Sequence, residues 1–144
     1  ALADGTYVIA SAFSGKCVDI AAASTANGAQ VQQYQCNGTG AQTFKLTNMG
    51  AGWYRLVNTH SGKAIDIASA STADGAKVQQ YTDNGTGAQR FSIKPGSDPT
   101  TFVITNENSG KCLDVTGWST NDSAKIQQWH CTGNVNQAWR FARQ

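Results

Sequence analysis

The chain has 144 residues, of which only 14% are charged, and its formal net charge is +2. This length suits one ordinary domain with its own core, and the scattered basic residues argue against nucleic acid or an anionic membrane as a partner. Gly, Thr, Ser, Asn and Val are common, whereas Glu107 is the one glutamate. Because strand and turn formers outnumber helix formers, we predict an all-β fold.

No run of 18 apolar residues occurs, and the first residues have neither a basic nor an apolar leader region. We therefore expect no membrane segment and a mature or excised piece of chain.

The first third of the chain contains four short strand-like runs, at 7–11, 16–21, 30–36 and 42–47. Turn residues separate them, such as Ser14-Gly15 and Ala26-Asn27-Gly28. The same succession follows twice more, which predicts twelve strands in all. Because the connections at 47–53 and 94–101 are short, we expect a single domain over 1–144 with lobes at about 1–48, 49–96 and 97–144.

Each copy carries an aspartate at the same place, followed after 15 residues by an aromatic residue and after 23 by a glutamine. The copies are offset by 47 and then 48 residues, a period that indicates a repeat architecture with a shared core. The residues in question are Asp19, Tyr34 and Gln42, then Asp66, Tyr81 and Gln89, then Asp114, Trp129 and Gln137.

The four cysteines have equal spacing in two copies: Cys17 precedes Cys36 by 19 residues, as Cys112 precedes Cys131. This predicts two disulfides, each inside one copy, with four buried thiols as the alternative. A zinc site is disfavoured because no CxxC pair occurs. Disulfides form in oxidising compartments, so we expect a secreted, extracellular protein.

An antiparallel pairing of the second and third runs that sets Cys17 opposite Cys36 also sets Asp19 opposite Tyr34. Cysteine, aspartate and ring then share one face, while the apolar residues between them point inward. One glutamine of each copy also falls on the inward face, which requires either an internally satisfied amide or a bulge. These are Gln33, Gln80 and Gln128.

A carboxylate, a ring and carboxamides repeated three times suit the recognition of neutral sugars. The C–H face of a pyranose packs on a ring, adjacent hydroxyls donate together to a carboxylate, and an amide both donates and accepts. The candidate carbohydrate-binding residues are Asp19, Tyr34, Asn37, Gln42, Asp66, Tyr81, Asn84, Gln89, Asp114, Trp129, Asn136 and Gln137. The final glutamine of each set either touches ligand or orients the aspartate; strand-end aspartates and core aromatics are the alternative for the whole set.

An enzyme is disfavoured. Glycoside hydrolysis usually needs two carboxyls within about 5–10 Å, but the aspartate occurs once per copy and Glu107 has no counterpart. His60 and His130 stand at non-equivalent positions of the repeat, so they offer neither a metal pair nor a base for a nucleophile. Gly38 and Gly40 lack the third glycine or the following lysine of a phosphate loop. We expect no catalytic residue, metal or cofactor.

The copies end in Gln42-Thr43-Phe44, Gln89-Arg90-Phe91 and Gln137-Ala138-Trp139. Together with the aspartates, rings and cysteine pairs, they resemble the Gln-x-Trp repeats of ricin-type β-trefoil lectins and of the family 13 carbohydrate-binding modules of secreted glycoside hydrolases. The resemblance spans essentially the whole chain. It implies a pseudo-threefold β-trefoil of twelve strands with one shallow sugar site per lobe, where the aspartate binds hydroxyls, the ring stacks, an asparagine such as Asn37 or Asn84 completes the contact and the final glutamine supports the aspartate.

The chain departs from this pattern in two copies. The second has Ala64 and Asp83 where the cysteines belong. The third has Thr132 in place of the asparagine, Asn136 directly before Gln137, and Trp118, whose ring either extends the stacking platform or covers it.

We therefore expect a monomeric, non-catalytic module that binds an oligo- or polysaccharide through up to three weak sites and is attached to a catalytic domain. Galactose-, xylose- or arabinose-containing glycans are favoured. The alternative is a protein-interaction or structural trefoil that binds no sugar.

Overall fold

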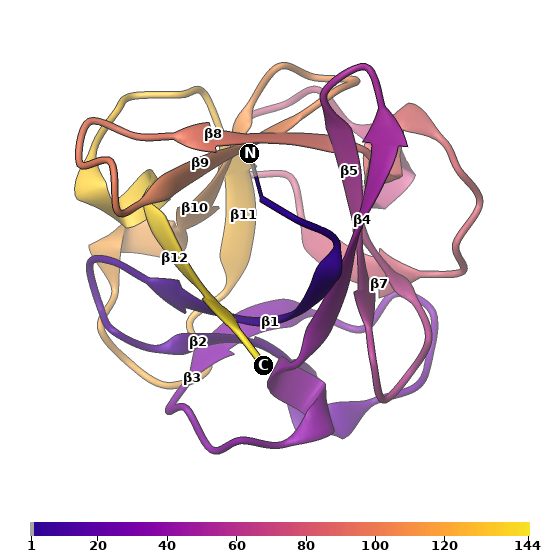
Figure 1. Ribbon diagram of the computed structural model, residues 1–144. Coiled ribbons are helices and arrows are strands. Elements are labelled where there is room, and N and C mark those ends of the chain that lie inside the picture. Colours follow the sequence, from indigo (N-terminus) through magenta and orange to yellow (C-terminus); the bar gives the residue numbers. More distant parts are fainter. Residues whose placement is uncertain (1) are drawn as a thin grey trace.

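Twelve strands make up most of the regular structure of residues 2–144 in the computed structural model (Figure 1). The first repeat contains β1 (Gly5–Ser11), β2 (Cys17–Ile20), β3 (Val31–Tyr34) and β4 (Phe44–Gly50). The second contains β5 (Trp53–Asn58), β6 (Ala64–Ile67), β7 (Val78–Tyr81) and β8 (Phe91–Pro95). The third contains β9 (Phe102–Asn106), β10 (Cys112–Val115), β11 (Ile126–Trp129) and β12 (Trp139–Arg143). The all-β prediction, with four strands in each repeat, is confirmed.

The first and last strands of the repeats close into a barrel. β1 pairs with β12 and β4, β5 pairs with β4 and β8, and β9 pairs with β8 and β12, always antiparallel. In Figure 1 these six strands surround the centre of the view. The remaining strands form the hairpins β2–β3, β6–β7 and β10–β11, one per repeat. The closed ring leaves no unpaired edge among the barrel strands.

One hydrophobic core serves all three repeats. It draws apolar side chains from the barrel strands and from the inner faces of the hairpins. The aromatic residue that ends each Gln-x-aromatic motif is fully buried there: Phe44, Phe91 and Trp139 are each 0% exposed. Their burial fixes the start of the last strand of each repeat, and with it the position of the glutamine two residues earlier.

The pairing within each hairpin differs by two residues from the pairing predicted from the sequence. Cys17 lies opposite Tyr34, and Asp19 lies opposite Gln32; the other two hairpins have the same register. The prediction had placed Cys36 opposite Cys17, but Cys36 lies beyond the end of β3 and reaches Cys17 from the following loop. Because the shift is an even number of residues, Cys17, Asp19 and Tyr34 still share one face of the hairpin.

Two repeats are closed by disulfides and one by an ion pair. Cys17 bonds to Cys36, and Cys112 to Cys131, as predicted, with Cα–Cα distances of 5.1 and 5.2 Å. In the second repeat Asp83 stands in the place of the second cysteine and accepts a hydrogen bond from Arg55 Nη1 at 2.7 Å.

The inward-facing glutamines join neighbouring repeats. Gln33 Oε1 accepts from Ser14 Oγ at 2.8 Å, while Gln33 Nε2 donates to the carbonyls of Ser119 and Asn121 at 3.0 and 2.9 Å. Gln80 and Gln128 make the equivalent bonds to carbonyls of the repeat that precedes each in the chain. Of the two alternatives, the internally satisfied amide is therefore correct, and the hairpin contains no bulge.

Among residues 2–144, none of the helices has the length and apolar composition that a membrane crossing requires.

Candidate functional site

The carboxylate of Asp19 lies on the outer face of the β2–β3 hairpin and is held by two amides. Its neighbours Val18 and Ile20 point into the core, so Asp19 faces outward, although only 6% of its surface is exposed. Gln32 Nε2 donates to Oδ1 at 3.0 Å and Gln42 Nε2 donates to Oδ2 at 2.9 Å. Each carboxylate oxygen thus has one amide donor and keeps acceptor capacity for another donor.

Gln42 positions the aspartate and the loop beside it. It ends the single-turn 3₁₀ helix η2 (Gly40–Gln42) and is 1% exposed. Its Nε2 group also donates to Gln35 O at 2.9 Å, and its Oε1 atom accepts from Asn37 N at 2.9 Å. Both amide hydrogens and the oxygen are therefore bonded to protein, so the geometry indicates that Gln42 orients Asp19.

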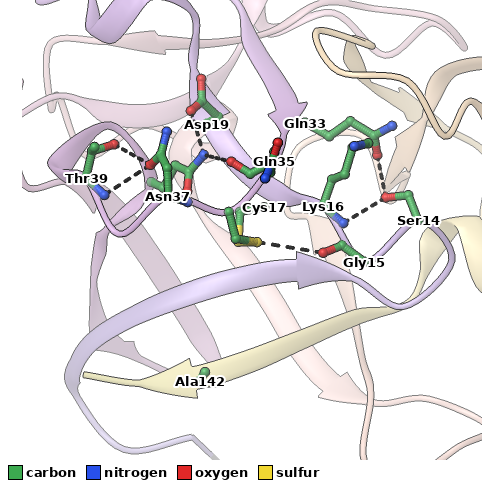
Figure 2. Close-up of a disulfide and its surroundings, with 12 residues drawn as sticks. Ser14, Gly15, Lys16, Cys17, Asp19, Gln33, Gln35, Asn37, Thr39 and Ala142 are labelled. Carbon is green, nitrogen blue, oxygen red and sulfur yellow. Dashed lines mark hydrogen bonds between the residues drawn. A yellow bond between two sulfur atoms is a disulfide. The ribbon is translucent and has the colours of Figure 1, made fainter.

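Asn37 presents a donor to the site. Its Oδ1 atom accepts from Thr39 N at 3.1 Å and from Thr39 Oγ1 at 2.7 Å, as Figure 2 shows. With the oxygen engaged in this turn, the Nδ2 group is the part of the amide that can face a ligand. The sequence had suggested that Asn37 both donates and accepts; the structure leaves it mainly the donating role.

A pocket of about 460 Å³ lies over Asp19 and is lined by Tyr34, a residue that is 39% exposed. Asn37 and Thr39 line one part of it, and Ala22 and Ala23 of η1 (Ala21–Ala23) line another. Ala22 has φ of 56° and Ala23 has φ of 50°, a backbone conformation that costs free energy in a non-glycine residue and that proteins often keep at ligand sites.

The second repeat reproduces this arrangement in a pocket of about 340 Å³. Asp66 receives Gln79 Nε2 at 3.1 Å and Gln89 Nε2 at 2.9 Å. Asn84 Oδ1 is engaged by its own turn, as Asn37 Oδ1 is. Tyr81 lines this pocket and is 41% exposed.

The third repeat brings the predicted residues together in a different arrangement. Asp114 Oδ1 accepts from Gln127 Nε2 at 3.0 Å, but Oδ2 accepts from two amides, Gln137 Nε2 at 3.0 Å and Asn136 Nδ2 at 3.1 Å. Trp129 is half-buried. Trp118 is 45% exposed and packs edge-on against Phe13, with ring centroids 5.2 Å apart.

Sequence reasoning missed four residues of these sites. Gln32, Gln79 and Gln127 each donate to the aspartate, and their position two residues before the aromatic residue, on the same strand face, was a usable signal. Ser123, with φ of 68°, lines the pocket of the first repeat although it belongs to the third. No pattern within one repeat points to such a neighbour.

Polar side chains at the edges of the sites tie each lobe to the next. Asp122 Oδ1 accepts from Gln35 N at 2.8 Å, Asp74 Oδ1 accepts from His130 N at 2.8 Å, and Asn27 Oδ1 accepts from Thr82 N at 2.9 Å. A hydrogen bond from Lys16 lowers the pKa of Asp122 below its ordinary value. A hydrogen bond with the His130 side chain, supported by Lys111, lowers the pKa of Asp74.

Residues 2–144 contain no group of three or more His, Cys, Asp or Glu side chains placed to hold a metal ion.

This fold and the threefold placement of a carboxylate beside a ring agree with the comparison to known families. Residues 1–81 and 84–144 match the family model described as ricin-type beta-trefoil lectin domain-like. The chain belongs to this family. The resemblance seen in the sequence is thereby confirmed, and with it the β-trefoil fold of this lectin domain.

Solved structures similar to the lectin domain include a designed protein and natural ones. The designed threefold symmetric protein ThreeFoil is 40% identical, with a TM-score of 0.95 over 98% of this chain and 100% of its own. The exo-β-1,3-galactanase 1,3Gal43A of Clostridium thermocellum is 35% identical, with a TM-score of 0.93 over 97% of this chain but only 30% of its own. The Rhizoctonia solani agglutinin is 23% identical, with a TM-score of 0.91 over 100% of this chain and 98% of its own. No curated protein matched the chain.

Proposed function

We propose that this lectin domain is a non-catalytic carbohydrate-binding module with three shallow sugar sites, one at each of Asp19, Asp66 and Asp114. The observation that carries the proposal is the pairing, in the first two lobes, of an exposed tyrosine ring with a nearly buried carboxylate whose oxygens each have one amide donor. This pairing matches a pyranose, which offers a C–H face to a ring and adjacent hydroxyls to a carboxylate.

Each group has a defined task in the proposed complex. The carboxylate accepts from two adjacent hydroxyls, and its burial strengthens those hydrogen bonds because the local dielectric is low. The rings of Tyr34, Tyr81 and Trp129 stack on the sugar, and Asn37 and Asn84 donate through Nδ2. The glutamines Gln42, Gln89 and Gln137 hold the aspartates in place without touching the sugar.

Each site alone binds a sugar weakly, and several sites together bind a polymer more tightly. One ring and a few partly solvated hydrogen bonds correspond to millimolar affinity, about −4 kcal/mol per site. A polymer that engages two or three lobes at once gains a factor on the order of 10²–10⁴ where its geometry allows. The module would in this way keep whatever is attached to it close to the surface of the polymer.

The comparison with the galactanase favours a galactose-containing glycan and an attached catalytic domain, as in family 13 carbohydrate-binding modules. At 35% identity the matched segment makes up 30% of that enzyme's chain, so a domain of this kind occurs beside a glycoside hydrolase. Glycans of xylose or arabinose are the next choice. The disulfides support a secreted, extracellular protein, and we expect the module itself to be a monomer.

A titration by calorimetry or by NMR tests the proposal, with galactose, xylobiose, arabinobiose and laminaribiose as ligands. We expect saturable millimolar binding of one of them, with shifts of backbone amides near Asn37 and Asn84. Tyr34→Ala should remove the shifts in the first lobe alone, while Met49→Ala, a change at another exposed side chain, should leave them all. A folded domain that binds none of the four sugars would instead favour the protein-interaction reading.

A further inference from the structure

The third lobe differs from the other two at the carboxylate oxygen that a sugar would meet. Asp114 Oδ2 accepts from Gln137 Nε2 and also from Asn136 Nδ2, at 3.0 and 3.1 Å. In the other lobes the position of Asn136 is taken by Ala41 or Ala88, which line the pockets and donate nothing to the carboxylate. Because Oδ2 accepts about two hydrogen bonds, Asp114 has only Oδ1 left for a ligand hydroxyl.

Asn136 supplies a replacement acceptor beside Asp114. The residue is 4% exposed, and its Oδ1 atom has no hydrogen-bond partner among residues 2–144. Its orientation is settled by the carboxylate, since a reversed amide would set two acceptors against each other. The atom has almost no surface open to solvent, and a buried acceptor without a donor is unfavourable, so a ligand hydroxyl would be favoured at this point once the covering side chains shift to admit it. Asn136 Oδ1 is a neutral acceptor, and it does not lie at the same point as the charged Oδ2 acceptors of Asp19 and Asp66.

Trp118 adds a second ring to the same lobe. Its counterparts Ala23 and Ala70 line the pockets of the other lobes. The ring packs edge-on against Phe13, whose counterparts His60 and Asn108 do not line those pockets. Trp118 therefore occupies the position that borders the pocket in the other two lobes, and its contact with Phe13 holds the ring there with nearly half of its surface open.

Resting on the proposed function, we propose that the third lobe binds an oligosaccharide of at least two units, whereas the first two lobes each bind one unit. In the third lobe one unit stacks on Trp129 and donates hydroxyls to Asp114 Oδ1 and Asn136 Oδ1, and the next unit stacks on Trp118. The neutral acceptor weakens the hold on a single unit, because hydrogen bonds to a charged acceptor are about twice as strong. The second ring restores affinity only for a ligand long enough to reach it.

A site-resolved NMR titration with galactose and with β-1,3-linked galactobiose tests this inference, and xylose with xylobiose serves if neither galactose ligand binds. The Trp118 and Trp129 indole N–H signals report the third lobe, and the Asn37 and Asn84 amides report the other two. We expect the disaccharide to bind the third lobe about tenfold more tightly than the monosaccharide, and both ligands to bind the first two lobes with similar affinity.

Substitutions of Trp118 and Asn136 separate the contribution of the second ring from that of the asparagine. Trp118→Ala should abolish the preference for the disaccharide. Asn136→Ala should make the third lobe bind the monosaccharide as tightly as the first lobe does. Should that variant not fold, Ala41→Asn in the first lobe should weaken monosaccharide binding there. Met49→Ala is the control for both series.

The outcomes distinguish this inference from the function on which it rests. The inference would be overturned if the ratio of disaccharide to monosaccharide affinity were the same in all three lobes, or if the preference for the disaccharide survived Trp118→Ala. Either result would leave the sugar-binding function intact. Unchanged selectivity in Asn136→Ala would show that no sugar hydroxyl reaches Oδ1 and would refute this part of the inference. Absence of binding at every lobe would reject the proposed function itself.

Discussion

Arg55 Nη1 lies 2.7 Å from Asp83 Oδ2, and this ion pair occupies the place of a disulfide in the second lobe. Asp83 stands where the other repeats have Cys36 or Cys131, and it joins the loop after β7 to strand β5. The loop that carries Asn84 is thus held by a partly exposed electrostatic contact, which salt screens, whereas the equivalent loops are held covalently.

Replacing this pair by a third disulfide should stabilise the domain. In the variant Ala64→Cys with Asp83→Cys, we expect the free energy of unfolding to rise by roughly 2–4 kcal/mol from loop closure, less about 0.2–1 kcal/mol for the lost ion pair. Urea unfolding measures the difference, with the reduced variant as control. An oxidised variant no more stable than its reduced form would show that the second lobe cannot adopt the geometry of the other two.

The buried glutamines between lobes should matter more than their exposed neighbours. Gln80→Leu leaves two carbonyls of the first lobe and the Ser61 hydroxyl without their partner, so we expect a loss of roughly 1–3 kcal/mol in the free energy of unfolding. Gln35→Leu, at an exposed position, is the control and should change it by less than about 0.5 kcal/mol. Equal effects from the two variants would refute the linking role of Gln80.

Asp74 and Asp122 should make stability depend on pH at the acid end. Both carboxyls have a lowered pKa, caused chiefly by hydrogen bonds with the side chains of His130 and Lys16 respectively. A carboxyl of this kind contributes stability above its unfolded pKa of about 3.9 and loses it as pH falls through the folded pKa. In the variant Asp74→Asn with Asp122→Asn, stability should therefore decrease less steeply than in the unaltered protein as the pH falls below about 4. Asn27 already makes the equivalent bond without a charge, so Asn27→Ala is the control and should leave that slope unchanged. Melting temperatures between neutral and acid pH provide the measurement, and identical slopes would contradict the account.

Gln42 should control sugar affinity without touching the sugar. Gln42→Ala removes the donor to Asp19 Oδ2 and the acceptor for Asn37 N, so we expect binding in the first lobe to weaken about tenfold because two contact groups lose their orientation. NMR titration reads the first and second lobes separately, and Gln89 keeps the second lobe as an internal control. Unchanged affinity in the first lobe would mean that Asp19 needs no such support.

The repeat spacing was enough to predict the strand content, the disulfides and the shared face of aspartate and ring. These depend on local order within one repeat, which the sequence displays three times. The hairpin register was missed because Cys36 was placed inside the strand, whereas it lies in the loop that follows β3. The positive φ of Ala22 was not predictable either, since alanine rarely adopts it and nothing in the residue type indicates it.

Contacts between lobes could not be predicted from the sequence, for a different reason. Ser123 lines the pocket of Tyr34, and Gln33 bonds to the carbonyls of Ser119 and Asn121, because the third lobe packs against the first. The periodicity shows that the lobes are alike but does not fix which loop of one lobe meets which strand of the next. The roles of the candidate site residues remain predictions, which binding measurements must decide.

Retention on an immobilised β-1,3-galactan, measured for a series of aspartate variants, tests the central proposal most directly. Asp19→Ala, Asp66→Ala and Asp114→Ala are compared singly and together, with circular dichroism to confirm folding of each. Each single variant should lose retention only modestly, because two sites remain to engage the polymer, and the triple variant should lose it altogether. Full retention by a folded triple variant would contradict the proposal that these three carboxylates bind the sugar.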